Sequence, residues 1–156
     1  MSDQRVFTAA LLTAVLIVAG AFTLREFFAF ELVRSSIYIA IAVLVYYGEN
    51  QYSFMLGIIA PPLWFIVDIL GGIFFRDFQV LYGYLMGKGV APLETPLHGL
   101  ARISAAVLMV VSIQAWRREV PGRFISKPFW TSVVVSLMYA AVLMGWHFGI
   151  LAAAHP

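Results

Sequence analysis

The chain has 156 residues, of which 62% are hydrophobic and 12% charged, whereas soluble proteins average about 45–50% apolar and about 25% charged residues. With apolar blocks of roughly 18 residues or more, this composition predicts an integral membrane protein whose main partner is the lipid bilayer, organised as one transmembrane domain over residues 1–156. The formal net charge is +2 and the basic residues form no dense patch, which argues against nucleic acid as a partner. The absence of cysteine excludes disulfides, thiolate metal sites and iron–sulfur clusters.

The first two apolar segments predict two membrane helices. The first runs from about Val6 to Leu24, and its Ala19-Gly20-Ala21 resembles a signal-peptide cleavage site, although the apolar stretch is longer than the usual core of such a peptide. The second runs from about Val33 to Gly48. Between them, the aromatic and charged residues of Arg25 to Glu31 suit the headgroup level of a bilayer, so we expect an interfacial turn there.

The third apolar block, Phe54 to Phe75, contains a charge where hydrocarbon is expected. Asp68 lies inside it, and Pro61-Pro62 should kink or break the helix because proline removes a backbone donor and clashes with the preceding turn. The connection that follows, Arg76 to Leu97, combines tyrosines with glycines and prolines. This pattern predicts a short interfacial helix and then an extended segment.

Two more apolar blocks complete the predicted fold. The fourth, His98 to Trp116, carries His98 and Arg102 on one helical face, and the fifth, Phe129 to Leu151, carries His147 near its end. We therefore predict an all-α bundle of about five transmembrane helices, with a short interfacial helix between the third and fourth.

The orientation of the spans is predicted from the loop charges, because cytoplasmic loops carry an excess of arginine and lysine. The connection between the fourth and fifth spans is the most basic, with Arg117, Arg118, Arg123 and Lys127. If that loop is cytoplasmic, the N-terminus is also cytoplasmic and the C-terminus lies outside, in what we take to be a prokaryotic plasma membrane. The opposite side then holds four cations, a poor fit to the same rule: Arg25, Arg34, Arg76 and Lys88.

Depth in the membrane brings four polar residues into one candidate site. Given these spans, Asp68, His98, Arg102 and His147 all fall in the same leaflet. An ionised side chain alone at the centre of a membrane helix costs about 2.5–3.5 kcal/mol, so Asp68 and Arg102 are expected to pair. The four residues then form a predicted ligand- or proton-binding site.

Several functions could use this site. We favour a transport-type protein that binds or moves a ligand or protons as a homo-oligomer or with partner subunits. In a second interpretation, Asp68 and Arg102 only fasten two helices in an accessory subunit of a larger membrane complex. Less favoured are a b-type haem between His98 and His147, and a zinc ion held by both histidines with Asp68, so no cofactor or metal is predicted. The chain lacks the usual catalytic motifs, which argues against an enzyme.

Overall fold

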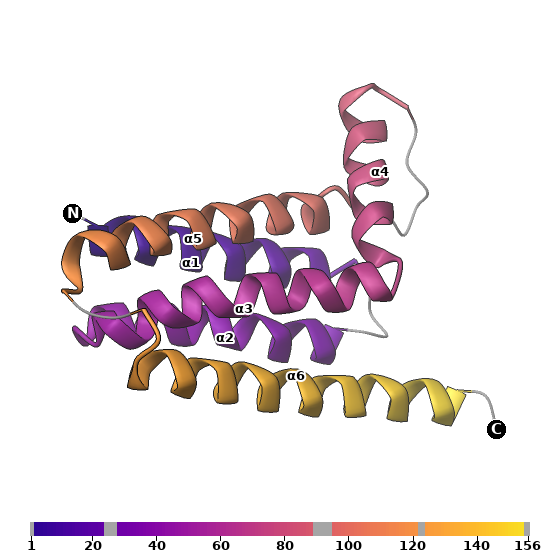
Figure 1. The fold of residues 1–156 in the computed structure, drawn as a ribbon. Coiled ribbons are helices and arrows are strands. Elements are labelled where there is room, and N and C mark those ends of the chain that lie inside the picture. The colour runs from indigo at the N-terminus through magenta and orange to yellow at the C-terminus, as the bar shows by residue number, and fades with distance from the viewer. Residues whose placement is uncertain (1, 24–27, 89–94, 122–123, 155–156) are drawn as a thin grey trace.

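The computed structural model describes residues 2–23, 28–88, 95–121 and 124–154, with side chains as far as Trp146 in the last range. Within these ranges the chain forms α-helices and no strand (Figure 1). The helices are α1 (Ser2–Ala21), α2 (Phe28–Tyr46), α3 (Asn50–Leu70), α4 (Ile73–Leu85), α5 (Leu97–Glu119) and α6 (Lys127–Ala154). In the described ranges five of them, all except α4, are long and apolar enough to cross a membrane, which confirms the predicted all-α membrane bundle.

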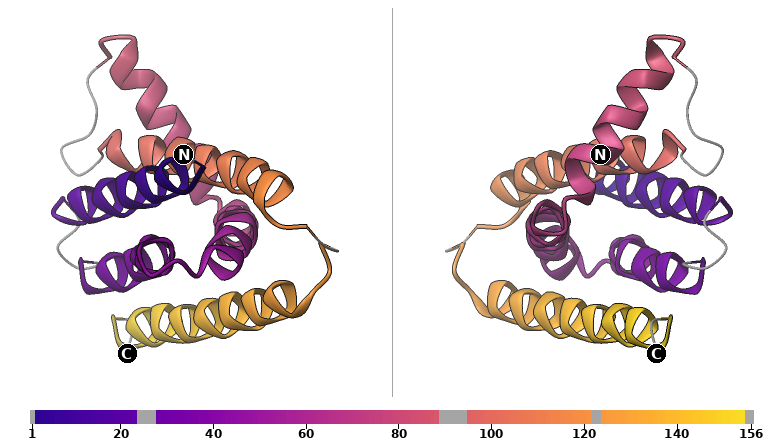
Figure 2. Two further views of the ribbon diagram at one scale, coloured as in Figure 1. Left: turned by 90° about the vertical axis from the view of Figure 1, so that its left-hand side faces the viewer. Right: turned by 90° about the vertical axis from the view of Figure 1, so that its right-hand side faces the viewer.

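The long helices alternate in direction and pack in layers. α1 lies against α2 and α5, and α3 lies against α2 and α5. α6 forms a separate layer on α2 and α3, on the side away from α1 and α5 (Figure 2). The Tyr139 hydroxyl fixes this outer helix to α2 by donating to the Val33 carbonyl and by bonding with Ser36 Oγ at 2.9 Å.

Small residues allow close approach between the helices. The hydroxyls of Thr13 in α1 and Ser104 in α5 share a hydrogen bond of 2.8 Å. Gly57 of α3 faces Ser112 of α5 so closely that a Cβ at position 57 would lie 3.1 Å from the Ser112 Cβ. Packing through small and hydroxyl-bearing residues is typical of helices in lipid, where no hydrophobic force drives helices together.

The start of α2 differs from the prediction. Phe28 to Glu31 form its first turn rather than an interfacial turn, while residues 25–27 lie outside the described part of the chain. Glu31 is only 8% exposed, so its side chain packs among neighbouring helices and is not solvated at the surface. The extra turn places a buried acid inside the bundle.

α3 also differs from the prediction. The helix continues through Pro61 and Pro62, so the break that the prolines could cause does not occur, since each proline removes only one backbone donor. The apolar block to Phe75 is instead divided at Gly72, which has a φ of 70°, a conformation that glycine adopts without a steric penalty. α4 therefore begins at Ile73 and projects from the end of the bundle, roughly crosswise to the long helices (Figure 1). This orientation suits a helix at a membrane interface.

Candidate functional site

A network of buried charges lies at the end of the bundle that carries α4. Arg102 of α5 donates through Nη1 to Oδ2 of Asp68 in α3, so the predicted pair is present. The two residues are 6% and 4% exposed. They meet because α3 ends and α5 begins at the same end of the bundle (Figure 1).

A second arginine, from α2, shares the same carboxylate. Arg34 Nη2 donates to Oδ2 of Asp68 at 2.7 Å, and its Nη1 lies 3.5 Å from Oε1 of Glu31. The Arg34 guanidinium also lies over the indole of Trp64, 4.9 Å from the ring centroid, a favourable cation–π geometry. The sequence analysis counts Arg34 among the loop charges and does not place it in the site. Glu31, three residues earlier and at the spacing of a helical ion pair, is the sequence feature that could have indicated its role.

A third carboxylate comes from α4. Arg102 Nε donates to Oδ2 of Asp77 at 2.8 Å, and Nη2 donates to the same oxygen. α4 reaches this position because Gly99 of α5 has no side chain: a Cβ there would lie 2.9 Å from the Asp77 carbonyl oxygen and 3.0 Å from the Leu81 Cβ. No sequence motif indicated Asp77, because its role depends on the turn that redirects the chain after α3.

We call these five side chains the charge network: Glu31, Arg34, Asp68, Asp77 and Arg102. Three carboxylates and two guanidiniums leave one negative charge in excess when all five are ionised. Ion pairing and hydrogen bonding offset the desolvation of these groups only where each atom finds a partner. The polar atoms of the network that have no partner therefore mark where it could bind a further polar group.

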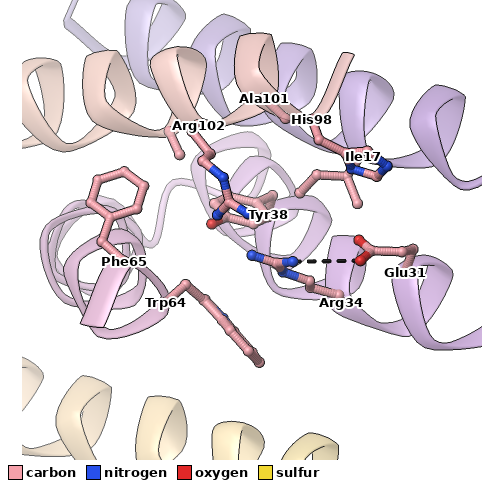
Figure 3. Close-up of a pocket in the computed structure, with 10 residues that line it drawn as sticks. Ile17, Glu31, Arg34, Tyr38, Trp64, Phe65, His98, Ala101 and Arg102 are labelled. Atoms are coloured by element: carbon pink, nitrogen blue, oxygen red, sulfur yellow. Dashed lines mark hydrogen bonds and ion pairs between the residues drawn. The ribbon is translucent and has the colours of Figure 1, made fainter. Parts of the chain in front are cut away.

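A small cavity adjoins the network, and side chains that carry such atoms line it. Its volume is about 20 Å³, and Glu31, Arg34, His98 and Arg102 contribute to its lining (Figure 3). Among the described residues, three buried polar atoms that belong to these side chains have no hydrogen-bond partner: Glu31 Oε2, Arg34 Nε and His98 Nε2. Asp68 does not line the cavity, which reaches its two arginine partners instead.

The two predicted histidines differ in position. His98, in the first turn of α5, packs its ring against Gly20 of α1, where a Cβ would lie 2.9 Å from His98 Cε1. The backbone of His147 belongs to α6, but its side chain lies outside the described part of the structure. The helices that carry the two histidines lie on opposite sides of α2 and α3 (Figure 2), which gives no support to a haem bound by both. No group of three or more His, Asp or Glu side chains within the described ranges could hold a metal ion.

Comparison with known proteins finds no protein-family model, no curated protein and no solved structure that matches the chain.

Proposed function

We propose that this membrane protein is of transport type and that its charge network binds protons and moves them across part of the bilayer. The observation that carries this proposal is the buried excess of carboxylates over guanidiniums beside a cavity with unpartnered polar atoms. Ionisable residues at membrane depth commonly mark proton or ion pathways. Binding one proton would bring the network to neutrality.

The size of the cavity favours a proton over a larger ligand. Drug-sized ligands occupy pockets of about 300–1,000 Å³. The cavity beside the network, at about 20 Å³, accommodates about one water molecule. In this conformation the site suits a proton carried by water.

Each predicted site residue has a role in this proposal. Asp68 accepts hydrogen bonds from both arginines and forms the centre of the network. Arg102 supplies the counter-charge and connects Asp68 to Asp77. His98 is a relay group at the cavity, and His147 remains a predicted relay group near the same end of the bundle.

The proposed orientation places the network in the outer half of a prokaryotic plasma membrane. The basic connection after α5 would be cytoplasmic, together with the N-terminus, and the C-terminus would lie outside. The ion pair of Arg34 with Asp68 supports this orientation, since an arginine paired within the bundle does not count as a loop charge. Five basic residues then stand on the cytoplasmic side against three outside: Arg5, Arg117, Arg118, Arg123 and Lys127, against Arg25, Arg76 and Lys88.

The second candidate function is that of an accessory subunit in a larger membrane complex. It is favoured by the number of helices that the network joins, since its five side chains come from α2, α3, α4 and α5. A network that only stabilises the bundle would have the same ion pairs. It would have no need of the unpartnered atoms at the cavity.

Proton flux distinguishes the two functions. The purified chain, in the oligomeric state that mild detergent preserves, is reconstituted into vesicles that contain a pH-sensitive dye, and a potassium diffusion potential is applied. We expect proton flux above that of protein-free vesicles and its loss in Arg102→Gln. Glu49→Gln, which changes an exposed acid away from the network, is the matched control and should retain the flux. Wild-type vesicles that behave like protein-free ones would overturn the proton-transport proposal and favour the accessory subunit.

A further inference from the structure

The three carboxylates of the charge network are not equally neutralised. Asp68 Oδ2 accepts from both arginines, and Asp77 Oδ2 accepts two donors from Arg102. Within the described part of the chain, Glu31 has one ion-pair partner, Arg34 Nη1, at a long distance of 3.5 Å from Oε1. Its Oε2 is buried and has no hydrogen-bond partner among the described residues. The excess negative charge of the network is therefore least compensated at Glu31.

The cavity brings further unpartnered atoms to this carboxylate. Figure 3 shows Glu31 and His98 on the same side of the cavity, with Arg34 next to Glu31. A buried water typically makes about three hydrogen bonds to polar groups that would otherwise be unsatisfied, and it needs about 10–15 Å³. The cavity, of about 20 Å³, meets the size requirement, and it is lined by the three side chains whose Oε2, Nε and Nε2 atoms are unpartnered: Glu31, Arg34 and His98. Arg34 Nε can only donate and Glu31 Oε2, when ionised, can only accept, so the three atoms suit a water that both gives and takes hydrogen bonds.

We propose that Glu31, rather than Asp68, is the carboxylate that takes up and releases the proton, through one water molecule held between Glu31, Arg34 and His98. The proton moves from a hydronium ion in the cavity to Glu31 Oε2, which leaves a neutral carboxylic acid and a neutral water. The network then changes from one excess negative charge to none. The proton-accepting site stands on this geometry, while its use in translocation rests on the proposed function.

The other groups around the cavity are consistent with a proton site at Glu31. α1 contributes Ile17, which carries no charge. The titratable or charged side chains that line the cavity with Glu31 are Arg34 and Tyr38 from α2, and His98 and Arg102 from α5. Asp68 and Asp77 do not line the cavity; they pair with the two arginines that do. Glu31 is thus the acid of the network that faces the cavity directly.

Infrared difference spectroscopy tests the assignment. The protein in lipid is perfused alternately with acidic and alkaline buffer, and the carbonyl stretch of a protonated carboxylic acid is recorded in H₂O and in D₂O. We expect a deuterium-sensitive carboxyl band in the wild type that is lost in the isosteric Glu31→Gln. Glu31→Asp should keep a band at a shifted frequency, and this variant also covers the case in which the glutamine variant does not fold. Glu49→Gln is the control and should leave the Glu31 band unchanged.

The outcomes separate this inference from the proposed function. A buried carboxyl band that persists unchanged in Glu31→Gln overturns the assignment. Loss of that band in Glu31→Gln, with no proton flux in wild-type vesicles, supports the proton site and overturns translocation. Wild-type flux that Glu31→Gln leaves unchanged supports translocation and overturns the role of Glu31. His98→Gln should change the water O–H band of the difference spectrum while the carboxyl band persists, and an unchanged water band would overturn the proposed water partner.

Discussion

Arg102 Nε donates to Asp77 Oδ2 at 2.8 Å, and this contact connects the helix at the end of the bundle to the charges inside it. α4 is also held by Leu81, by the close fit of its backbone to Gly99, and by Phe74, whose ring lies 5.6 Å from that of Phe65 in α3. Much of the rest of α4 is apolar and exposed, including Phe75, at 61%, and Leu85, at 71%. This charged contact is therefore one of the interactions that hold α4 in position.

Asp77→Asn should loosen α4 more than it loosens the long helices. The amide cannot neutralise the buried guanidinium, so the contact between α4 and α5 weakens. We expect faster backbone hydrogen exchange over Ile73–Leu85, with exchange in α1 nearly unchanged, as measured by mass spectrometry in lipid nanodiscs. Glu119→Gln changes an exposed acid at the end of α5 and is the control. Equal exchange in α4 of wild type and Asp77→Asn would show that the ion pair does not hold the helix.

Asp68→Asn should be strongly destabilising, because it removes the carboxylate shared by Arg102, which is buried, and Arg34, which is partly buried. Breaking a buried ion pair typically costs about 3–5 kcal/mol. Arg102→Gln alone should also destabilise the bundle, because it leaves Asp68 and Asp77 without this guanidinium. The double change should cost less than the sum of the two single changes, since both remove the same ion pair. A double-mutant cycle of thermal or denaturant unfolding in detergent should give a coupling of about 0.5–3 kcal/mol between positions 68 and 102. Additive effects of the two changes would mean that the side chains do not interact.

The spans and the central ion pair could be predicted from the sequence for physical reasons. Apolar segments of roughly 18 or more residues have few stable environments other than lipid, so the five long helices follow from hydropathy. Asp68 and Arg102 were expected to meet because isolated charges at one depth each need a partner. Both expectations depend on local composition and on helix geometry alone.

The rest of the network depends on where helices begin and how the chain turns. Glu31 and Arg34 lie beside phenylalanines, a composition that fits a membrane interface as well as a first helical turn, and only the packed bundle shows that α2 begins at Phe28. Asp77 reaches Arg102 because the chain turns at Gly72, and the sequence there does not specify the direction of the following helix. Hydropathy predicts neither the first residue of α2 nor the direction of α4, since it contains no information about neighbouring helices.

Gly57→Ala should destabilise the contact between α3 and α5. The new methyl group would lie 3.1 Å from the Ser112 Cβ and would overlap the hydroxyl. Overpacking of this kind lowers the free energy of unfolding by about 1–3 kcal/mol. The unfolding temperature measured in detergent should therefore fall. The matched control is Gly83→Ala in α4, where nothing lies within 4 Å of the added methyl group, so helix propensity should make this change neutral or slightly stabilising. Equal effects of the two substitutions would argue against close packing at Gly57.

The proposed orientation can be tested by labelling, because the chain has no cysteine and any engineered one is unique. Glu119→Cys and Lys88→Cys place exposed thiols at opposite ends of the bundle, one at the last residue of α5 and the other after α4. In intact cells a membrane-impermeant maleimide should label Cys at position 88, while position 119 should react only after the membrane is permeabilised.

The reverse labelling pattern would place the charge network on the cytoplasmic side and would overturn the orientation derived from the basic loop. Labelling of both positions from outside would mean that α5 does not carry the chain across the membrane, which contradicts the five-span topology. Because Glu31 and His98 lie in the first turns of α2 and α5, at the end of the bundle that carries α4 (Figure 1), the side on which position 88 reacts also identifies the membrane surface nearer to Glu31.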